Sequence, residues 1–171
     1  MTPRPNYTAF EVGKFEDSQI QELRIYGDGF IIEARSDSKI LDGFLNDFLS
    51  WTNKELGLVP FATSKPEKYY ESSIVVKSSK DLTTIISIKS DIVADLNRLL
   101  KKSDHPMQQF TTTGLVLDCD SLEKGGLKKP FRFLLERRVD TPFAANVFYS
   151  QAPLSTEDHL AFLGRIEDLA R

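Results

Sequence analysis

Residues Glu22–Ala34, which read ELRIY-GDG-FIIEA, carry the clearest hairpin signal in this chain. Two apolar-rich runs, residues 22–26 and 30–34, flank Gly27-Asp28-Gly29. Glycine adopts positive φ at little steric cost, so this turn lets two strands fold back on each other. The stretch therefore predicts a β-hairpin.

The residues after this hairpin predict a helix over residues 38–56. Its apolar residues recur at helical spacing and form one broad stripe: Ile40, Leu41, Phe44, Leu45, Phe48 and Leu49. Ser36 or Ser38 can cap its start, and Gly57 stands where a left-handed residue commonly ends a helix.

On either side of this region, further β-rich runs cover residues 7–15, 69–76, 82–88, 110–120, 131–139 and 146–149. The runs 69–76 and 82–88 are interpreted as a second hairpin around a polar turn. Apolar stripes predict two more helices, over residues 90–102 and 155–170. In the last of these, Ser155 and Asp158 form a sequence similar to a capping box.

This order predicts an α+β fold. We expect a largely antiparallel sheet built from hairpins, with about three helices, near 38–56, 90–102 and 155–170, packed on it. The chain has 171 residues, which fits a single α+β domain over residues 1–171.

Composition narrows the class of protein. The chain has 22 Lys and Arg against 25 Asp and Glu, a net charge of −3, so it is not a globally basic nucleic-acid binder. Two His and one Cys exclude zinc fingers and disulfide frameworks, and no nucleotide-binding glycine motif occurs. No signal-like start or membrane-length apolar run is found, so we expect a cytoplasmic protein without cofactor or membrane contact.

One candidate for chemistry is the pair Asp118 and Asp120, which follows the apolar run 114–117. Residues two apart on a strand face the same side, and paired carboxylates can hold a divalent cation. The motif resembles the first motif of haloacid-dehalogenase-type phosphatases and the metal site of palm-type polymerases and primases. That resemblance implies a metal-dependent phosphoryl or nucleotidyl enzyme, but the supporting motifs of those families are missing. We prefer a strand that runs into a polar turn.

A second candidate is the basic segment 124–138. Its cations are Lys124, Lys128, Lys129, Arg132, Arg137 and Arg138. Phe131 and Phe133 alternate with Arg132, a pattern similar to the sheets of RRM-type RNA-binding domains. We prefer a hairpin with a solvated, lysine-rich tip, because the alternating aromatic residues suit the inward face of a core strand. Nucleic acid is thus a disfavoured partner, and contact with a protein stays open.

The 12 Phe residues exceed what three helix stripes need, so some of them are candidates for exposed anchors. Trp51, Phe61 and Phe143 are the aromatic residues that we expect at a contact surface. His105 and His159 lack clustered ligands, and no catalytic triad or paired glutamates at catalytic spacing are found. We expect a non-enzymatic protein-interaction domain, such as a subunit, an adaptor or an immunity-type inhibitor. The alternatives are the metal-dependent enzyme and the nucleic-acid contact.

Overall fold

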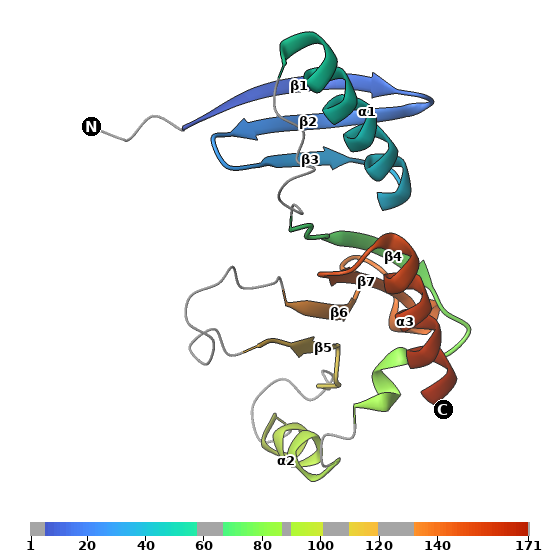
Figure 1. The fold of residues 1–171 in the computed structure, drawn as a ribbon. Helices are drawn as coiled ribbons and strands as arrows, with labels where there is room; N and C mark the ends of the chain where they lie inside the picture. The colour runs from blue at the N-terminus through green and yellow to red at the C-terminus, as the bar shows by residue number, and fades with distance from the viewer. Residues whose placement is uncertain (1–5, 58–66, 87–89, 101–109, 120–131, 171) are drawn as a thin grey trace. The chain divides into compact units, whose positions relative to one another are not determined.

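The computed structural model describes residues 6–57, 67–86, 90–100, 110–119 and 132–170 (Figure 1). The chain divides into two compact units, Met1–Lys68 and Tyr69–Arg171, called here the N-terminal and C-terminal units. The predicted α+β class is confirmed, but the strands form two antiparallel sheets, one in each unit.

The N-terminal unit is a three-stranded antiparallel sheet with one helix. Its strands β1 (Tyr7–Phe15), β2 (Ser18–Tyr26) and β3 (Phe30–Ala34) lie in sequence order. The predicted hairpin at Gly27-Asp28-Gly29 is confirmed, with Ile25 opposite Phe30. Neither Gly27 nor Gly29 adopts the positive φ expected of this turn.

Helix α1 (Ser38–Leu56) follows the predicted bounds. Asp37, rather than a serine, caps it by accepting the Lys39 N–H, and Gly57 ends it at φ 61°. Aromatic side chains join the helix to the sheet: the centroids of Phe15 and Phe44 lie 5.4 Å apart.

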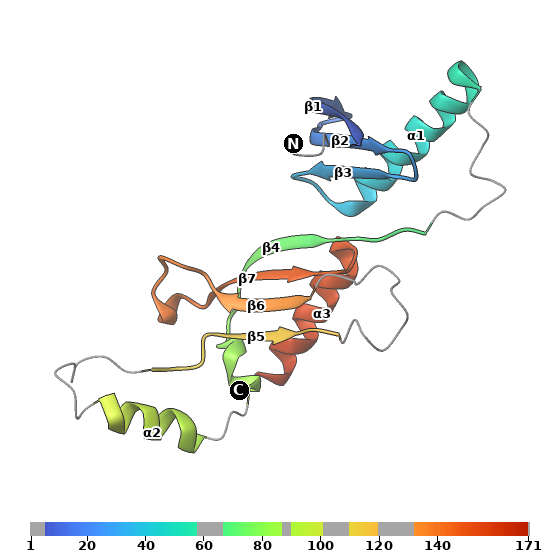
Figure 2. The ribbon, with the colours of Figure 1, turned by 90° about the vertical axis from the view of Figure 1, so that its left-hand side faces the viewer.

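The C-terminal unit is a four-stranded sheet in the order β4-β7-β6-β5. Its strands are β4 (Ser72–Lys77), β5 (Gly114–Leu117), β6 (Phe133–Arg137) and β7 (Val147–Ala152). Helix α3 (Thr156–Leu169) covers one face of this sheet (Figure 2). The predicted cap of α3 is confirmed, because the Ser155 side chain accepts the Asp158 N–H.

The core of the C-terminal unit lies between α3 and the sheet. Phe133, Leu135 and Phe148 come from the strands, and Leu163 and Ile166 come from α3. Alternate residues of β7 are buried, which is the period expected of a strand with one covered face.

The predicted hairpin of residues 69–76 and 82–88 is wrong. Leu82–Ile85 form a short 3₁₀ helix, η2, and β4 pairs instead with β7, so that Val76 lies opposite Phe148. The physical reason is Asp81, whose carboxylate accepts the Thr83 N–H and hydroxyl and thereby starts a helical turn.

Helix α2 (Ser90–Leu100) matches the described part of the predicted helix 90–102. Asn97 fixes it to the segment before β5 by exchanging two hydrogen bonds with the Phe110 backbone, 3.0 and 2.6 Å long. Ile92, Leu96 and Leu99, which share its apolar stripe, are exposed.

None of the helices in the described ranges is long and apolar enough to cross a bilayer.

Candidate functional site

The connection between β6 and β7, residues 138–146, is called here the β6–β7 loop. Its backbone is fixed internally: the Thr141 hydroxyl donates to the Arg138 carbonyl at 2.6 Å, and the Asn146 N–H donates to the Phe143 carbonyl at 3.1 Å. Asp140 and Asn146 have φ values of 62° and 49°, in the left-handed region that Asp and Asn tolerate best among non-glycine residues. These hydrogen bonds hold the loop from within, between its first residue and its last.

The side chain of Arg137, the last residue of β6, supports this loop. Its side chain is only 8% exposed and forms a 2.6 Å ion pair with Asp81. The same guanidinium donates to the Phe143 carbonyl at 2.7 Å. It also lies 4.7 Å from the Phe143 ring centroid and 5.3 Å from that of Phe148, within cation–π range of both. Its Nε has no hydrogen-bond partner within the described part of the chain.

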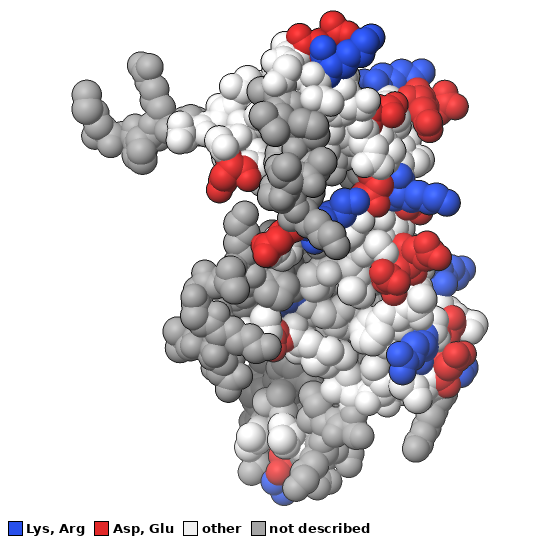
Figure 3. Space-filling model, viewed as in Figure 1, with Lys and Arg blue, Asp and Glu red and all other residues white. Residues whose placement is uncertain are grey.

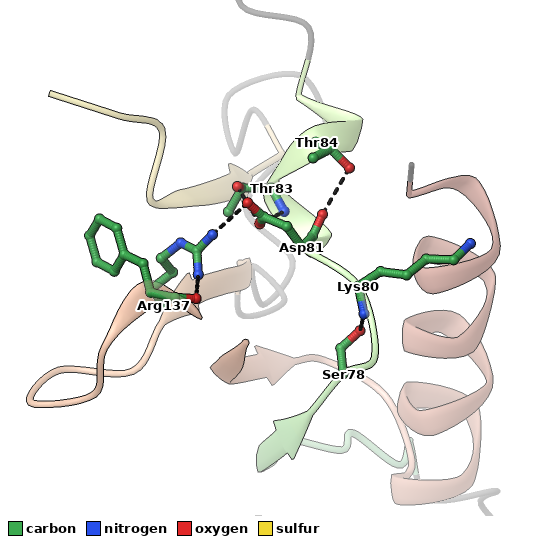
Figure 4. A network of polar contacts seen from close by, with 7 residues as sticks. Ser78, Lys80, Asp81, Thr83, Thr84 and Arg137 are labelled. Atoms are coloured by element: carbon green, nitrogen blue, oxygen red, sulfur yellow. Dashed lines mark hydrogen bonds and ion pairs between the residues drawn. The ribbon is translucent and has the colours of Figure 1, made fainter. Parts of the chain in front are cut away.

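The Asp81 carboxylate takes part in two separate interactions. One carboxylate oxygen caps η2 through Thr83, and the other binds Arg137 (Figure 4). The N-cap of η2 therefore also supplies the counter-charge of the buried arginine.

The residues before Asp81 are attached to the C-terminal end of α3. The hydroxyls of Ser78 and Ser79 and the Ser79 N–H all donate to one Glu167 oxygen, at 2.7–2.9 Å. The Ser78 hydroxyl, followed by the Ser79 donors, holds the pKa of the Glu167 carboxyl below its usual value. The Lys80 ammonium donates to the carbonyls of Glu167 and Ala170, where a cation also complements the helix dipole. These contacts link α3 to Asp81.

The loop presents apolar side chains on a fixed frame. Val139 is 76% exposed and Phe143 is 49% exposed, although the Phe143 ring also lies against Arg137. Exposed cations stand at its base, because Lys77 lies opposite Val147 and the Arg138 N–H donates to the Val147 carbonyl. The arrangement suits insertion of the loop tip into a recess.

A second polar cluster lies under α3. His159 is fully buried, with Nδ1 2.6 Å from the Ser72 hydroxyl and Nε2 2.8 Å from the Ser150 hydroxyl. Ser150 in turn donates to the Leu134 carbonyl at 2.8 Å. Burial lowers the pKa of His159. Because these side chains are buried, the cluster joins secondary structures and does not present a nucleophile to substrate.

The structure distributes the predicted site residues widely. Phe143 and Arg137 come together in the β6–β7 loop, and Arg138 lies beside them. Arg137, however, is engaged inside the fold, so it is a support for the loop rather than a free surface cation. Trp51 lies half-exposed on α1 against Phe48, in the other unit.

The remaining candidates are an exposed arginine, an exposed aspartate and five residues outside the described ranges. Arg132 is exposed just before β6. One oxygen of Asp118 accepts the Cys119 N–H at 2.9 Å, as expected where a strand runs into a polar turn. The candidates outside the described ranges are Phe61, Asp120, Lys124, Lys128 and Lys129.

Neither the charges on the face shown in Figure 3 nor the metal-ligating groups of the described residues add a further site. On the face shown in Figure 3, acidic and basic side chains alternate and do not gather into a patch of one sign. The described residues contain no group of three or more His, Cys, Asp or Glu that could hold a metal ion.

Two features of the structure were not predicted from the sequence: the role of Asp81 in supporting the loop, and the cluster of Ser72, Ser150 and His159. Ser72 and His159 are 87 positions apart, and no spacing in the sequence indicates that they meet. For Asp81, a signal is present: in the sequence Asp81-Leu82-Thr83, an aspartate can cap a helical turn. The β-rich composition of residues 82–88 led instead to the prediction of a strand.

Comparison with protein families, with curated proteins and with solved structures finds no match to this chain.

Proposed function

We propose that this chain is a non-enzymatic, cytoplasmic protein-interaction protein that inserts its β6–β7 loop into an apolar recess of a partner protein. The observation that carries the proposal is a fixed loop with two exposed apolar side chains, Val139 and Phe143, held by the buried Arg137. The exposed Cys119, the only cysteine of the chain, is in keeping with a reducing compartment.

Preorganisation is the physical basis of the proposal. Association costs free energy when flexible side chains and loops must be ordered, so a loop that is already ordered binds more tightly for the same contacts. Asp140 and Asn146 supply the left-handed backbone angles of the loop, which Asp and Asn adopt more readily than other non-glycine residues. Aromatic anchors of this kind commonly contribute a large share of the binding free energy.

The partner that fits has an apolar pocket with acidic groups at its rim. Val139 and Phe143 would fill the pocket, while Lys77 and Arg138 at the base of the loop would meet the rim. Complementary charge of this kind raises association rates and selects among partners.

The test begins with affinity capture from the native host by the full chain, followed by purification of the captured protein. Its Kd is then measured for the wild type, for Val139→Ser/Phe143→Ser and for Leu169→Ser, which alters an equally exposed residue of α3. We expect the double variant to lose at least about tenfold in affinity and Leu169→Ser to bind like the wild type. An unchanged Kd for the double variant, at unchanged thermal stability, would contradict the proposal.

A further inference from the structure

His159 attaches the first turn of α3 to two strands through one imidazole. Its Nδ1 meets Ser72 at the start of β4, and its Nε2 meets Ser150 in β7. All three side chains are buried.

The hydrogen bonds define which nitrogen carries the proton. Ser150 donates its hydroxyl hydrogen to the Leu134 carbonyl, so it must accept from Nε2–H. Nδ1 is then unprotonated and accepts from Ser72. The neutral imidazole is therefore fully satisfied, and a second proton on Nδ1 would point at a hydroxyl that now donates to it.

Within the described residues, the hydrogen-bond partners of this imidazole are the two serines, and no charged side chain is paired with it. On α3, Glu157 and Asp158 precede it and are exposed, with Asp158 bonded to Ser155. Before β4, Glu71 binds Gln151, while Arg137 of β6 is paired with Asp81.

The remaining surroundings of the ring also disfavour a cation. The Phe133 and His159 rings lie nearly perpendicular, with centroids 6.3 Å apart. The start of a helix carries positive partial charge, which disfavours a cation at His159. Without a counter-charge, a buried cation is strongly unfavourable.

We propose that His159 is an acid-sensitive latch: proton uptake by its imidazole detaches α3 from β4 and β7 and thereby loosens the β6–β7 loop. The path to the loop consists of contacts already described. α3 holds Ser78–Lys80 through Glu167, Asp81 follows Lys80 and binds Arg137, and Arg137 fixes Phe143. The consequence for partner binding rests on the proposed function, whereas the latch itself does not.

The sign of the effect follows from linkage. Burial lowers the pKa of His159 in the folded state, so the unfolded or opened state takes up the proton first. The attachment of α3 is complete above the ordinary histidine pKa of about 6.5 and weakens as pH falls below it. Between pH 7.5 and 5.5 the opening equilibrium shifts by up to about tenfold.

Hydrogen exchange of the full chain at pH 7.5 and 5.5, corrected for intrinsic exchange rates, tests this inference. In the wild type we expect faster exchange of α3 and of residues 138–146 at the lower pH, by up to about tenfold. His159→Gln should lose this difference between the two pH values. His105→Gln, which alters the only other histidine, should keep it.

Equal protection of α3 at both pH values in the wild type would overturn the latch, and so would a pH response retained by His159→Gln. Faster exchange of α3 at pH 5.5 without faster exchange of residues 138–146 would overturn the proposed coupling between α3 and the loop. Should His159→Gln not fold, NMR titration of the wild type decides: an imidazole of His159 that titrates near pH 6.5 while α3 stays closed contradicts the inference. No partner enters these measurements, so their failure leaves the proposed function untouched.

Discussion

At the residue scale, the pair of Arg137 and Asp81 is asymmetric. The Arg137 side chain is 8% exposed, but that of Asp81 is 36% exposed. Removing a partner leaves the other charge behind, and the cost depends on how well water can reach the charge that remains. The two halves of this ion pair should therefore differ in their contribution to stability.

Asp81→Asn keeps the amide oxygen that can cap η2 but leaves the buried guanidinium without a counter-charge. We expect a loss of about 3 kcal/mol in the free energy of unfolding. Arg137→Met keeps apolar packing between Phe143 and Phe148 and leaves a carboxylate that water can reach, so we expect about 1 kcal/mol. Urea denaturation followed by circular dichroism measures both, and the reverse order would contradict this account of the pair.

Single-residue signals in the sequence were informative where the chemistry is local. Gly57 and Ser155 end and begin helices as predicted, because a cap depends on neighbours within four positions. The role of Arg137 could not be predicted, because its counter-charge Asp81 lies far away in sequence and its burial depends on the packed sheet.

At the scale of elements, the pairing of β5 with β6 leaves no room for a side chain at Gly114, which lies opposite Glu136. A Cβ on Gly114 would lie 2.6 Å from the Leu135 carbonyl oxygen and 2.9 Å from the Glu136 Cβ. We expect Gly114→Ala to lower the free energy of unfolding by about 1–3 kcal/mol. Gly164→Ala, in the same unit, is the matched control, since nothing lies within 4 Å of its Cβ. Equal stability of the two variants by thermal denaturation would show that β5 moves freely.

The end of α3 provides a second element-scale prediction. Lys80 donates to two carbonyls of the last turn, at 3.1 and 2.8 Å. Lys80→Met removes both bonds and the charge that complements the helix dipole, so we expect a loss of about 1 kcal/mol. Lys77→Met, which alters an exposed lysine of β4, should change stability little. Chemical denaturation measures this difference, and equal effects of the two substitutions would exclude a capping role for Lys80.

Elements with strong periodicity could be predicted, and those decided by a competing local signal could not. The stripes of α1 and α3 gave nearly correct bounds because helical period is read within the element itself. Residues 82–88 have the composition of a strand, but the Asp81 cap and the partner that β4 finds in β7 determine the outcome. Strand partners separated by this much chain leave no local pattern.

At the scale of the whole molecule, alternating hairpins and helices predict the α+β class but do not assign strands to sheets. The two compact units each have their own sheet and their own helix packed on it. The prediction of a single domain over residues 1–171 is a statement about cooperativity, and unfolding experiments can test it.

The single tryptophan makes that test possible, because Trp51 lies in the N-terminal unit. Since each unit has its own sheet and its own packed helix, we expect two separate unfolding transitions. Gly114→Ala, in the C-terminal unit, should then lower the midpoint measured by hydrogen exchange of β6 and β7 while the Trp51 fluorescence midpoint stays constant. Phe44→Ala, which removes a ring packed on Phe15, is the reciprocal variant and should lower the Trp51 midpoint alone. If both variants shift both midpoints together, the chain unfolds as one cooperative domain.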